Sequence, residues 1–336
     1  PTGEINFKKV GVESLNNPLQ AFIASSRDSL GVRSSSIFKK EVVQPQEGNS
    51  KEQLQQLYKL LIAPIAEQLP KNPNERITFI PQGSLFSVPF GALIDGQGKY
   101  LIEKHTILTA PSIQVLDLAG QLTKSDGNVL IVGNPTMPTI KVGDLEQNFK
   151  PLPGSEREAL GVAQLLNVEA LTGSKANKAT VVEKMKTARV IHLATHGILD
   201  DFKGFGVPGA IVLAPDGKRD DTIDGLLTAG EIFEMKLRAD LVVLSACDTG
   251  NGVVTGDGVV GLSRSLLSAG ARSVVVSLWK VNDNSTEFLM TQFYQNLQKN
   301  PDKAVALRQA MLTTMQQQQY SNPKHWAAFT LIGAAM

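Results

Sequence analysis

Apolar residues in the second half of the chain are concentrated in short runs that alternate with segments of helical spacing. The runs are dominated by Val, Ile, Leu and Ala, a composition typical of strands buried on both faces of a sheet. They cover 129–132, 189–194, 241–246 and 273–279, and the helical segments cover 155–166, 181–186, 257–269, 285–297 and 302–315. This alternation predicts a mainly parallel α/β sheet with helices on both faces, which binds ligands at the carboxyl ends of its strands.

The first part of the chain is more weakly patterned. Leucines at helical spacing predict a helix over 51–69, which Pro64 kinks or divides. Short strands are expected near 77–80 and 106–108, followed by a helix from a Ser112 cap to about Leu122. In the second part, Ser155 and Glu158 have the Ser-x-x-Glu spacing of a helix cap, so we expect the helix to begin at Ser155.

Length and composition narrow the functional classes. A length of 336 residues suggests two lobes or one large α/β unit; starting from two lobes, we place a boundary in the loop 124–127. This gives a smaller α/β lobe, 1–126, and a larger lobe, 127–336. The net charge of +1 provides no overall field for nucleic acid, and no apolar run reaches the about 18 residues that span a membrane. Partners are expected at local pockets.

Cys247 is the only cysteine of the chain. An intramolecular disulfide is therefore impossible, which favours a cytoplasmic protein over a secreted one. The first residues include no initiator Met and no signal-peptide pattern. We therefore expect a fragment of a longer protein, with a further region upstream.

Two of the apolar runs end in a reactive residue followed by a turn sequence. One ends in Thr195-His196-Gly197, and the other in Ser245-Ala246-Cys247-Asp248. A thiol with a pKa of about 8.5 is only a few per cent ionised at neutral pH, and a neighbouring imidazole raises its reactivity. A histidine about fifty residues before the cysteine has the order and separation found in caspases. His196 and Cys247 are therefore candidates for a base and a nucleophile.

Other readings of these residues remain open. A single cysteine at a strand end is commonly a small core residue, so Cys247 judged alone does not establish a nucleophile. His192 and His196 lie about 13 Å apart if the segment is a strand, too far to share a metal ion. We therefore interpret His192 as a hydrogen-bonded residue of the sheet, and His105 and His325 as structural, and we expect no metal and no cofactor.

The segment from Gly256 to Gly261 matches the pattern G-x-G-x-x-G. A dinucleotide site needs that motif directly after its strand, with an acidic residue at the end of the next strand. Here about ten residues intervene, and Lys280 occupies the acidic position. Nucleotide binding is therefore the weakest of the alternatives.

Ordered motifs over most of the chain, from about Leu57 to Ala335, are similar to those of a known family. They include Ile80-Pro81-Gln82-Gly83, Pro89-Phe90, Leu152-Pro153-Gly154-Ser155-Glu156, Asp224-Gly225-Leu226-Leu227-Thr228, the His196 and Cys247 segments, Ser277-Leu278-Trp279-Lys280-Val281-Asn282-Asp283 and His325-Trp326-Ala327-Ala328-Phe329. The sequence resembles the CHAT domain, a caspase-like cysteine peptidase domain related to separase. The resemblance implies a caspase-like three-layer sandwich, a Cys-His dyad, a protein substrate and an upstream tetratricopeptide-repeat or other sensor region. The first lobe could then be a degenerate, pseudo-peptidase half.

The resemblance also implies roles for individual residues. Cys247 takes the place of the nucleophile and His196 that of the base, with the backbone N–H groups of Gly197 and Cys247 as the oxyanion hole. Asp283 matches the separase position that holds a basic P1 side chain, which would suit Arg or Lys. Asp248, beside the nucleophile, is a second candidate for substrate binding, or else a turn residue.

Two features limit this transfer. The family often has Asp-Pro followed by Ser-Gly where this chain reads Gly-Phe-Gly-Val-Pro-Gly-Ala over 204–210, so the loop near the substrate can differ. Asp283 also precedes an expected helix, whose macrodipole alone would favour a carboxylate there. The sequence thus predicts a cysteine endopeptidase that forms a thioester and cleaves after a basic residue. The alternative is a catalytically silent caspase-like scaffold or regulatory domain.

Overall fold

The computed structural model describes residues 3, 5–12, 18–31, 50–142, 145–201, 208–217, 223–245, 256–279 and 281–336. The principal strands are β1 Arg76–Phe79, β2 Thr106–Thr109, β3 Asn128–Pro135, β6 Ala170–Gly173, β7 Ala188–Ala194, β11 Leu241–Leu244, β12 Ser273–Ser277 and β13 Phe329–Gly333. They form one sheet in the order β1-β2-β13-β12-β11-β7-β3-β6. Every neighbouring pair is parallel except β12 and β13. The prediction of a mainly parallel α/β sheet is therefore confirmed.

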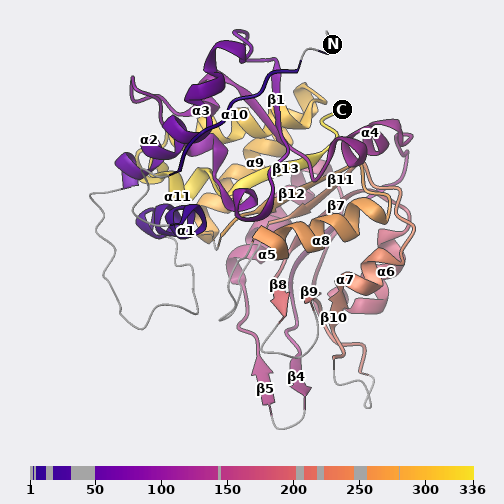
Figure 1. Ribbon diagram of the computed structural model, residues 1–336. Helices are drawn as coiled ribbons and strands as arrows, with labels where there is room; N and C mark the ends of the chain where they lie inside the picture. The colour runs from indigo at the N-terminus through magenta and orange to yellow at the C-terminus, as the bar shows by residue number, and fades with distance from the viewer. Residues whose placement is uncertain are drawn as a thin grey trace.

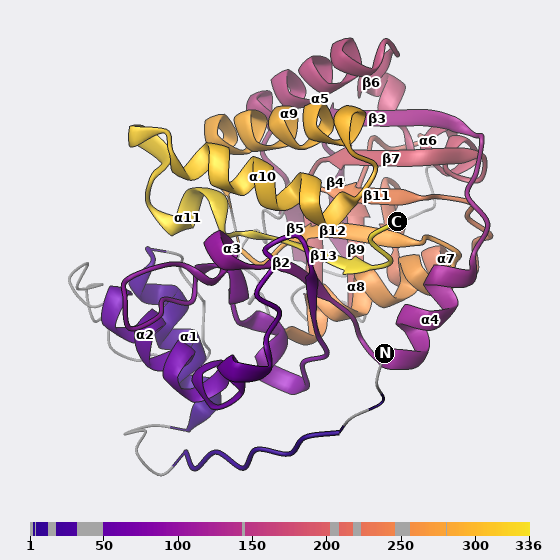
Figure 2. The same cartoon turned by 90° about the horizontal axis from the view of Figure 1, so that it is seen from above.

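Helices cover both faces of this sheet. Their bounds are α1 Leu19–Ser29, α2 Ser50–Leu61, α3 Leu101–Lys104, α4 Ile113–Gln121, α5 Pro153–Leu166, α6 Lys178–Met185, α7 Ala229–Phe233, α8 Gly256–Ser268, α9 Asp283–Lys299, α10 Lys303–Met315 and α11 Pro323–Trp326. Seen from above, α5, α9 and α10 lie on one side of the sheet, and α4, α7 and α8 lie on the other (Figure 2). The strands between these layers are apolar and buried; all residues of β11 and β12 are inaccessible to solvent or nearly so. This is the expected three-layer sandwich.

Smaller strands project below the sheet near its carboxyl edge (Figure 1). Strands β8 Gly197–Asp201, β9 Pro208–Val212 and β10 Leu226–Thr228 form an antiparallel sheet, and β4 Thr139–Val142 pairs with β5 Leu145–Asn148. Residues of these strands and Phe149 form a separate apolar cluster of six buried residues: Ile140, Phe149, Ile198, Ala210, Val212 and Leu226. The sequence pattern did not predict these strands because each is short and its apolar residues serve a second, small core.

Local chemistry explains several helix boundaries. Pro64 divides the helix expected over 51–69 into α2 and a 3-10 helix over Ala63–Gln68, as predicted. Ser112 caps α4 through a hydrogen bond from the Val115 N–H (3.1 Å). The prediction for α5 was wrong: the helix begins at Pro153, and no side chain caps it. Proline has no N–H to satisfy and a backbone angle suited to the first helical position, so the helix starts two residues before Ser155.

The first lobe contributes strands to the same sheet as the rest of the chain. Strand β2 pairs with β13 through Thr109 and Ile332, so the sheet continues across the loop at which we placed the boundary. Arg308 on α10 also reaches into the first lobe, where it donates hydrogen bonds to the carbonyl groups of Ile102 (2.8 Å) and Glu103 (2.7 Å). Hydrogen bonds of one sheet therefore join the two parts of the chain. The boundary between lobes at residue 126 stays a prediction.

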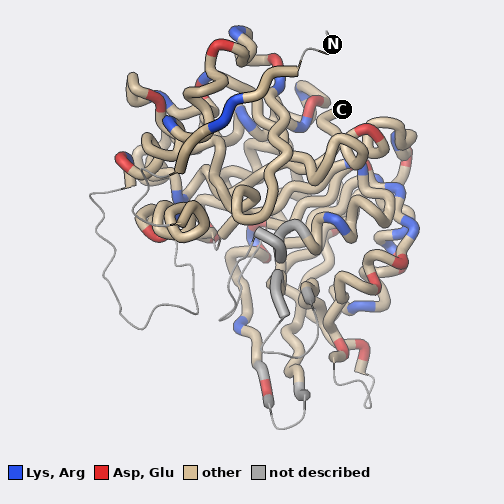
Figure 3. The backbone as a smooth tube through the Cα atoms, in the orientation of Figure 1, with Lys and Arg blue, Asp and Glu red and all other residues tan. Residues whose placement is uncertain are grey.

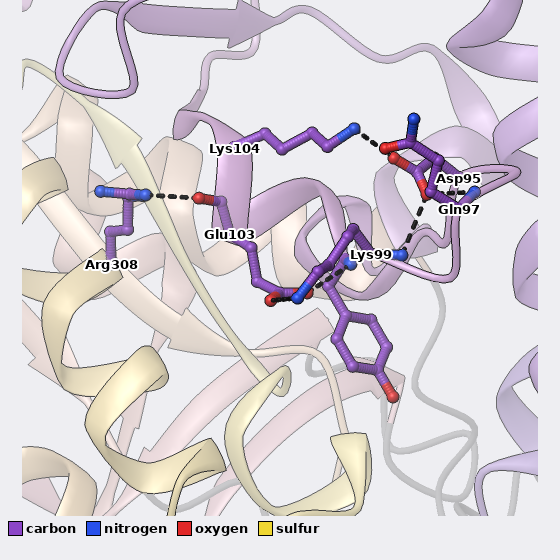
Figure 4. A network of polar contacts seen from close by, with 7 residues as sticks. Asp95, Gln97, Lys99, Glu103, Lys104 and Arg308 are labelled. Atoms are coloured by element: carbon purple, nitrogen blue, oxygen red, sulfur yellow. Dashed lines mark hydrogen bonds and ion pairs between the residues drawn. The ribbon is translucent and has the colours of Figure 1, made fainter.

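A polar network closes the turn that precedes α3 in the first lobe (Figure 4). Asp95 is 5% exposed, forms an ion pair with Lys104 and accepts hydrogen bonds from the backbone N–H groups of Gln97 (2.8 Å) and Lys99 (2.9 Å). Burial alone would raise the pKa of Asp95, but these hydrogen bonds outweigh it, and the pKa lies below its ordinary value. The charge of Asp95 therefore stabilises this turn.

Charged residues of both signs are interspersed over the periphery (Figure 3). Within the described ranges, no helix combines the length and the apolar character required to cross a membrane.

Candidate active site

The carboxyl ends of β7 and β11 lie side by side in the middle of the sheet. The two strands are parallel, with Leu241 opposite Val190 and Leu244 opposite Leu193. The N–H of Ser245 continues this pairing with a hydrogen bond to the carbonyl of Leu193 (3.2 Å). His196 follows β7 by two residues, so it stands at the edge where parallel sheets bind ligands. Cys247 and Asp248 lie outside the described residues.

A backbone carbonyl fixes the orientation of the His196 imidazole. The side chain is 2% exposed, and its Nε2 lies 2.7 Å from the carbonyl oxygen of Lys150. A carbonyl can only accept a hydrogen bond, so Nε2 must carry the proton. In the neutral ring, Nδ1 then holds the lone pair that can accept a proton. This tautomer suits a general base that acts through Nδ1.

Packing against Phe149 and backbone hydrogen bonds to β9 also hold His196 in place. The Phe149 ring lies 5.5 Å from the imidazole, centroid to centroid, and Phe149 belongs to the small apolar core. The Thr195 hydroxyl donates to the carbonyl of Val212 (2.7 Å), and the Val212 N–H donates to the carbonyl of His196 (2.9 Å). The β9 strand therefore fixes the backbone from which His196 extends.

His192, on the same strand, occupies a different environment in the interior. It is fully buried, with Nδ1 at 3.1 Å from the Tyr294 hydroxyl and Nε2 at 3.1 Å from Oε1 of Glu158. Burial, and then the charge of Glu158, raise the pKa of Tyr294 well above its ordinary value, so that hydroxyl keeps its proton and can donate to Nδ1. The Ser245 hydroxyl lies 3.5 Å from Nε2. The structure thus shows His192 as the hydrogen-bonded sheet residue that its strand position indicated.

Asp283 is the first residue of α9 and is exposed to solvent. Its side chain lies directly against Gly154 in the first turn of α5, where any Cβ would overlap the carboxylate. Asp283 therefore lies beside the amino ends of two helices, both of which favour a negative charge. The helix pattern of the sequence predicted this position at a helix start. The carboxylate is exposed and does not lie in a buried pocket. Whether the carboxylate also contacts a substrate remains a prediction.

The other two histidines, His325 and His105, have surroundings of their own. His325 Nδ1 lies 3.2 Å from the Ser285 hydroxyl, and burial followed by the charge of Lys324 lowers the pKa of its imidazole. Burial, followed by the charges of Lys104 and Arg308, lowers the pKa of His105 in the first lobe. Among the residues that the structure describes, no three His, Cys, Asp or Glu side chains are grouped to hold a metal ion.

Sequence reasoning missed the residues that hold His196 in place. The Lys150 carbonyl cannot be recognised from a side chain, because the backbone provides the contact. The available signal was Pro151 and Pro153, which flank Leu152 and stiffen the segment that ends at α5. Glu158 was interpreted as a capping residue, but it lies 2% exposed beside His192.

Comparison with protein families gives a match over most of the chain. The family model described as the CHAT domain matches residues 51–334. Tetratricopeptide repeat protein 28 from Homo sapiens is 30% identical to this chain, covering 89% of the chain and 14% of its own length. The Mus musculus protein of the same name is also 30% identical, covering 86% of the chain and 14% of its own length. The chain therefore spans about one seventh of these curated relatives.

Solved structures share the fold at low sequence identity. Gingipain R, an Arg-specific cysteine proteinase, is 10% identical with a TM-score of 0.50, covering 94% of this chain and 74% of its own. The separase of Saccharomyces cerevisiae, solved in complex with securin, is 15% identical with a TM-score of 0.46, covering 77% of this chain and 16% of its own. The likeness to gingipain R shows a caspase-like fold.

Proposed function

Because the chain belongs to the CHAT domain family, whose model matches residues 51–334, we propose that it is a cysteine endopeptidase with a His196 and Cys247 dyad. The observation that carries the proposal is the orientation of His196, with Nε2–H bound to the Lys150 carbonyl (2.7 Å). This bond assigns the basic lone pair to Nδ1, at the strand edge shared with β11.

The register of the sheet supports the pairing of these two residues. Residues of β7 lie opposite residues of β11 with a constant offset of 51 positions (244 − 193). The same offset leads from His196 to position 247 of the sequence, which is the only cysteine of the chain. β7 and β11 are neighbouring strands of the sheet, so the segments that follow them begin side by side at its carboxyl edge.

The proposed reaction uses these groups in two steps. The sulfur of Cys247 attacks the peptide carbonyl carbon, and the thiol proton passes to Nδ1 of His196. The C–N bond then breaks, and His196 returns the proton to the leaving amine, which leaves a thioester on Cys247. Water attacks the thioester with His196 as base, the C–S bond breaks, and the acid is released with regeneration of the thiol.

Gly197 is suited to stabilise the oxyanion of the tetrahedral intermediate. The bond from the Val212 N–H to the His196 carbonyl makes Gly197 and Ile211 a non-hydrogen-bonded pair of the β8–β9 ladder. The N–H of Gly197 therefore takes no part in this ladder. Together with the N–H of Cys247, it is our proposal for the oxyanion hole.

We further propose a protein substrate with Arg or Lys at P1, which Asp283 binds through its exposed carboxylate. Asp248 is the second proposed substrate contact. A positional peptide library should show preference for a basic P1 residue, and Asp283→Asn should weaken that preference. The matched control is Asp117→Asn on α4, another exposed carboxylate. A preference for acidic or apolar P1 residues would contradict this part of the proposal.

A thiol-labelling experiment tests the central claim, because Cys247 is the only thiol of the chain. We expect labelling of Cys247 at neutral pH at a rate well above that of a free thiol. Cys247→Ala should abolish cleavage of a protein substrate. Labelling at the rate of an ordinary thiol, with and without an upstream tetratricopeptide-repeat region, would instead favour the silent scaffold.

A further inference from the structure

Asn134, at the end of β3, lies between the first turn of α5 and the segment that holds His196. We propose that Asn134 is a positioning residue that fixes the tautomer of His196 through the Lys150 carbonyl. This inference rests on the proposed function of His196 as a base and adds a residue to that machinery. Asn134 acts through the Lys150 segment and is not itself catalytic.

The side-chain amide of Asn134 connects two neighbouring parts of the chain. Its Oδ1 accepts a hydrogen bond from the N–H of Leu152 (2.7 Å). Its Nδ2 donates to Oε2 of Glu156 in the first turn of α5 (2.8 Å). An amide turned by half a rotation would direct its oxygen at a carboxylate and its NH₂ at an N–H group. The two contacts therefore permit a single orientation.

The segment that Asn134 holds has few other attachments available. Pro151 and Pro153 have no N–H, so the only N–H between Lys150 and Gly154 is that of Leu152, and Asn134 accepts it. Pro151 also restricts Lys150 to extended backbone conformations. With Leu152 held on one side and Lys150 restricted on the other, the Lys150 carbonyl has a defined direction toward Nε2 of His196.

The backbone of Asn134 is specialised for this placement. Asn134 has φ of +43°, in the left-handed region that asparagine tolerates better than most residues, and the pairing of β3 shifts register between Gly133 and Pro135. At Gly133 a Cβ would overlap Ala159, so the absence of a side chain lets α5 lie against the strand end. The irregular strand end turns the Asn134 side chain toward α5 instead of along the sheet.

Selective ¹⁵N-histidine labelling of the whole chain tests this role. Imidazole nitrogen shifts report which ring nitrogen carries the proton, and His196→Gln identifies the His196 signals among those of the four histidines. We expect the Nε2–H tautomer in the parent protein. Asn134→Gly keeps the backbone conformation but removes the amide, and should produce a mixture of tautomers. Labelling of Cys247 should slow by about 10- to 100-fold, as expected for a misplaced reacting group.

Two further variants separate positioning from general damage to the fold. Asn167→Gly is the matched control, because Asn167 also has a left-handed backbone (φ +54°) at the other end of α5 and should leave His196 unchanged. Asn134→Asp should disturb His196, because it places a carboxylate beside Glu156. Asn134→Asp combined with Glu156→Gln reverses donor and acceptor in that hydrogen bond, and should restore the Nε2–H tautomer.

The outcomes distinguish this inference from the proposed function. An unchanged His196 tautomer in Asn134→Gly would overturn the role of Asn134, even if Cys247 reacts as a nucleophile. Disturbance by Asn134→Gly with rescue in the double variant would support the role of Asn134, even if Cys247 proves to be an ordinary thiol. In that second case the proposed peptidase function alone would fail.

Discussion

Strand β7 and the turn that follows it carry two histidines, His192 and His196, whose ring nitrogens have different partners. His192 in the interior contacts side chains at both ring nitrogens, Tyr294 and Glu158, and is completely buried. His196 at the strand end has its Nε2 proton directed to a backbone carbonyl. The proton is on Nε2 in both rings, because the Tyr294 hydroxyl donates to Nδ1 of His192 and the Lys150 carbonyl can only accept from Nε2 of His196. The two rings differ in what accepts that proton: a buried side-chain carboxylate at His192 and a backbone carbonyl at His196.

Replacing His196 should have the largest effect in this comparison. The amide of His196→Gln can still donate to the Lys150 carbonyl, but it cannot accept a proton. We expect the labelling rate of Cys247 and any Cys247-dependent cleavage to fall by about 10²- to 10⁴-fold. His105→Gln in the first lobe is the control and should retain the parent rates. Equal rates in both variants would remove His196 from the mechanism.

Much of this comparison is visible in the sequence, because strand ends are marked by composition. The apolar runs at 189–194 and 241–246 locate two neighbouring strands, and the reactive residues follow directly. The hydrogen bonds that distinguish the two histidines were not predictable. Glu158 and Tyr294 are 34 residues before and 102 residues after His192, and only the packing of α5 and α9 against β7 brings them together.

Removing the contact between Glu158 and His192 should lower the stability of the fold more than it lowers activity. Glu158 is 2% exposed, and Glu158→Ala would leave His192 buried without its charged partner. Loss of the polar partner of a buried group costs about 1–3 kcal/mol of unfolding free energy. Urea denaturation measures this change. Glu169→Ala removes an exposed ion pair with Lys175 and should cost less than about 1 kcal/mol. Equal costs would mean that Glu158 contributes no more than a surface charge.

Asp95 extends the comparison to a carboxylate far from the site (Figure 4). Asp95→Asn should cost about 1–2 kcal/mol, through loss of the ion pair with Lys104 and weaker hydrogen bonds from the Lys99 and Gln97 N–H groups. The pKa of Asp95 is lowered in the folded state. Its contribution is therefore complete above the unfolded-state pKa near 4 and declines as the pH falls through the folded-state pKa.

Denaturation at a series of pH values checks this prediction. The difference in stability between the parent and Asp95→Asn should be constant at neutral pH and should shrink in acid. Asp117→Asn, at an exposed position of α4, is the control and should show little difference at any pH. A difference for Asp95→Asn that grows as the pH falls would contradict the direction of the pKa shift.

The smallest expected effect is that of the Tyr294 hydroxyl. Tyr294→Phe keeps the buried ring and removes only the group that donates to Nδ1 of His192 (3.1 Å). Loss of one neutral hydrogen bond costs about 1 kcal/mol. The labelling rate of Cys247 should remain that of the parent, because the His196 contact with Lys150 does not involve Tyr294. A slower rate would show that the interior histidine acts on the strand end through Ser245, whose hydroxyl lies 3.5 Å from His192 Nε2, and the two environments would then be coupled.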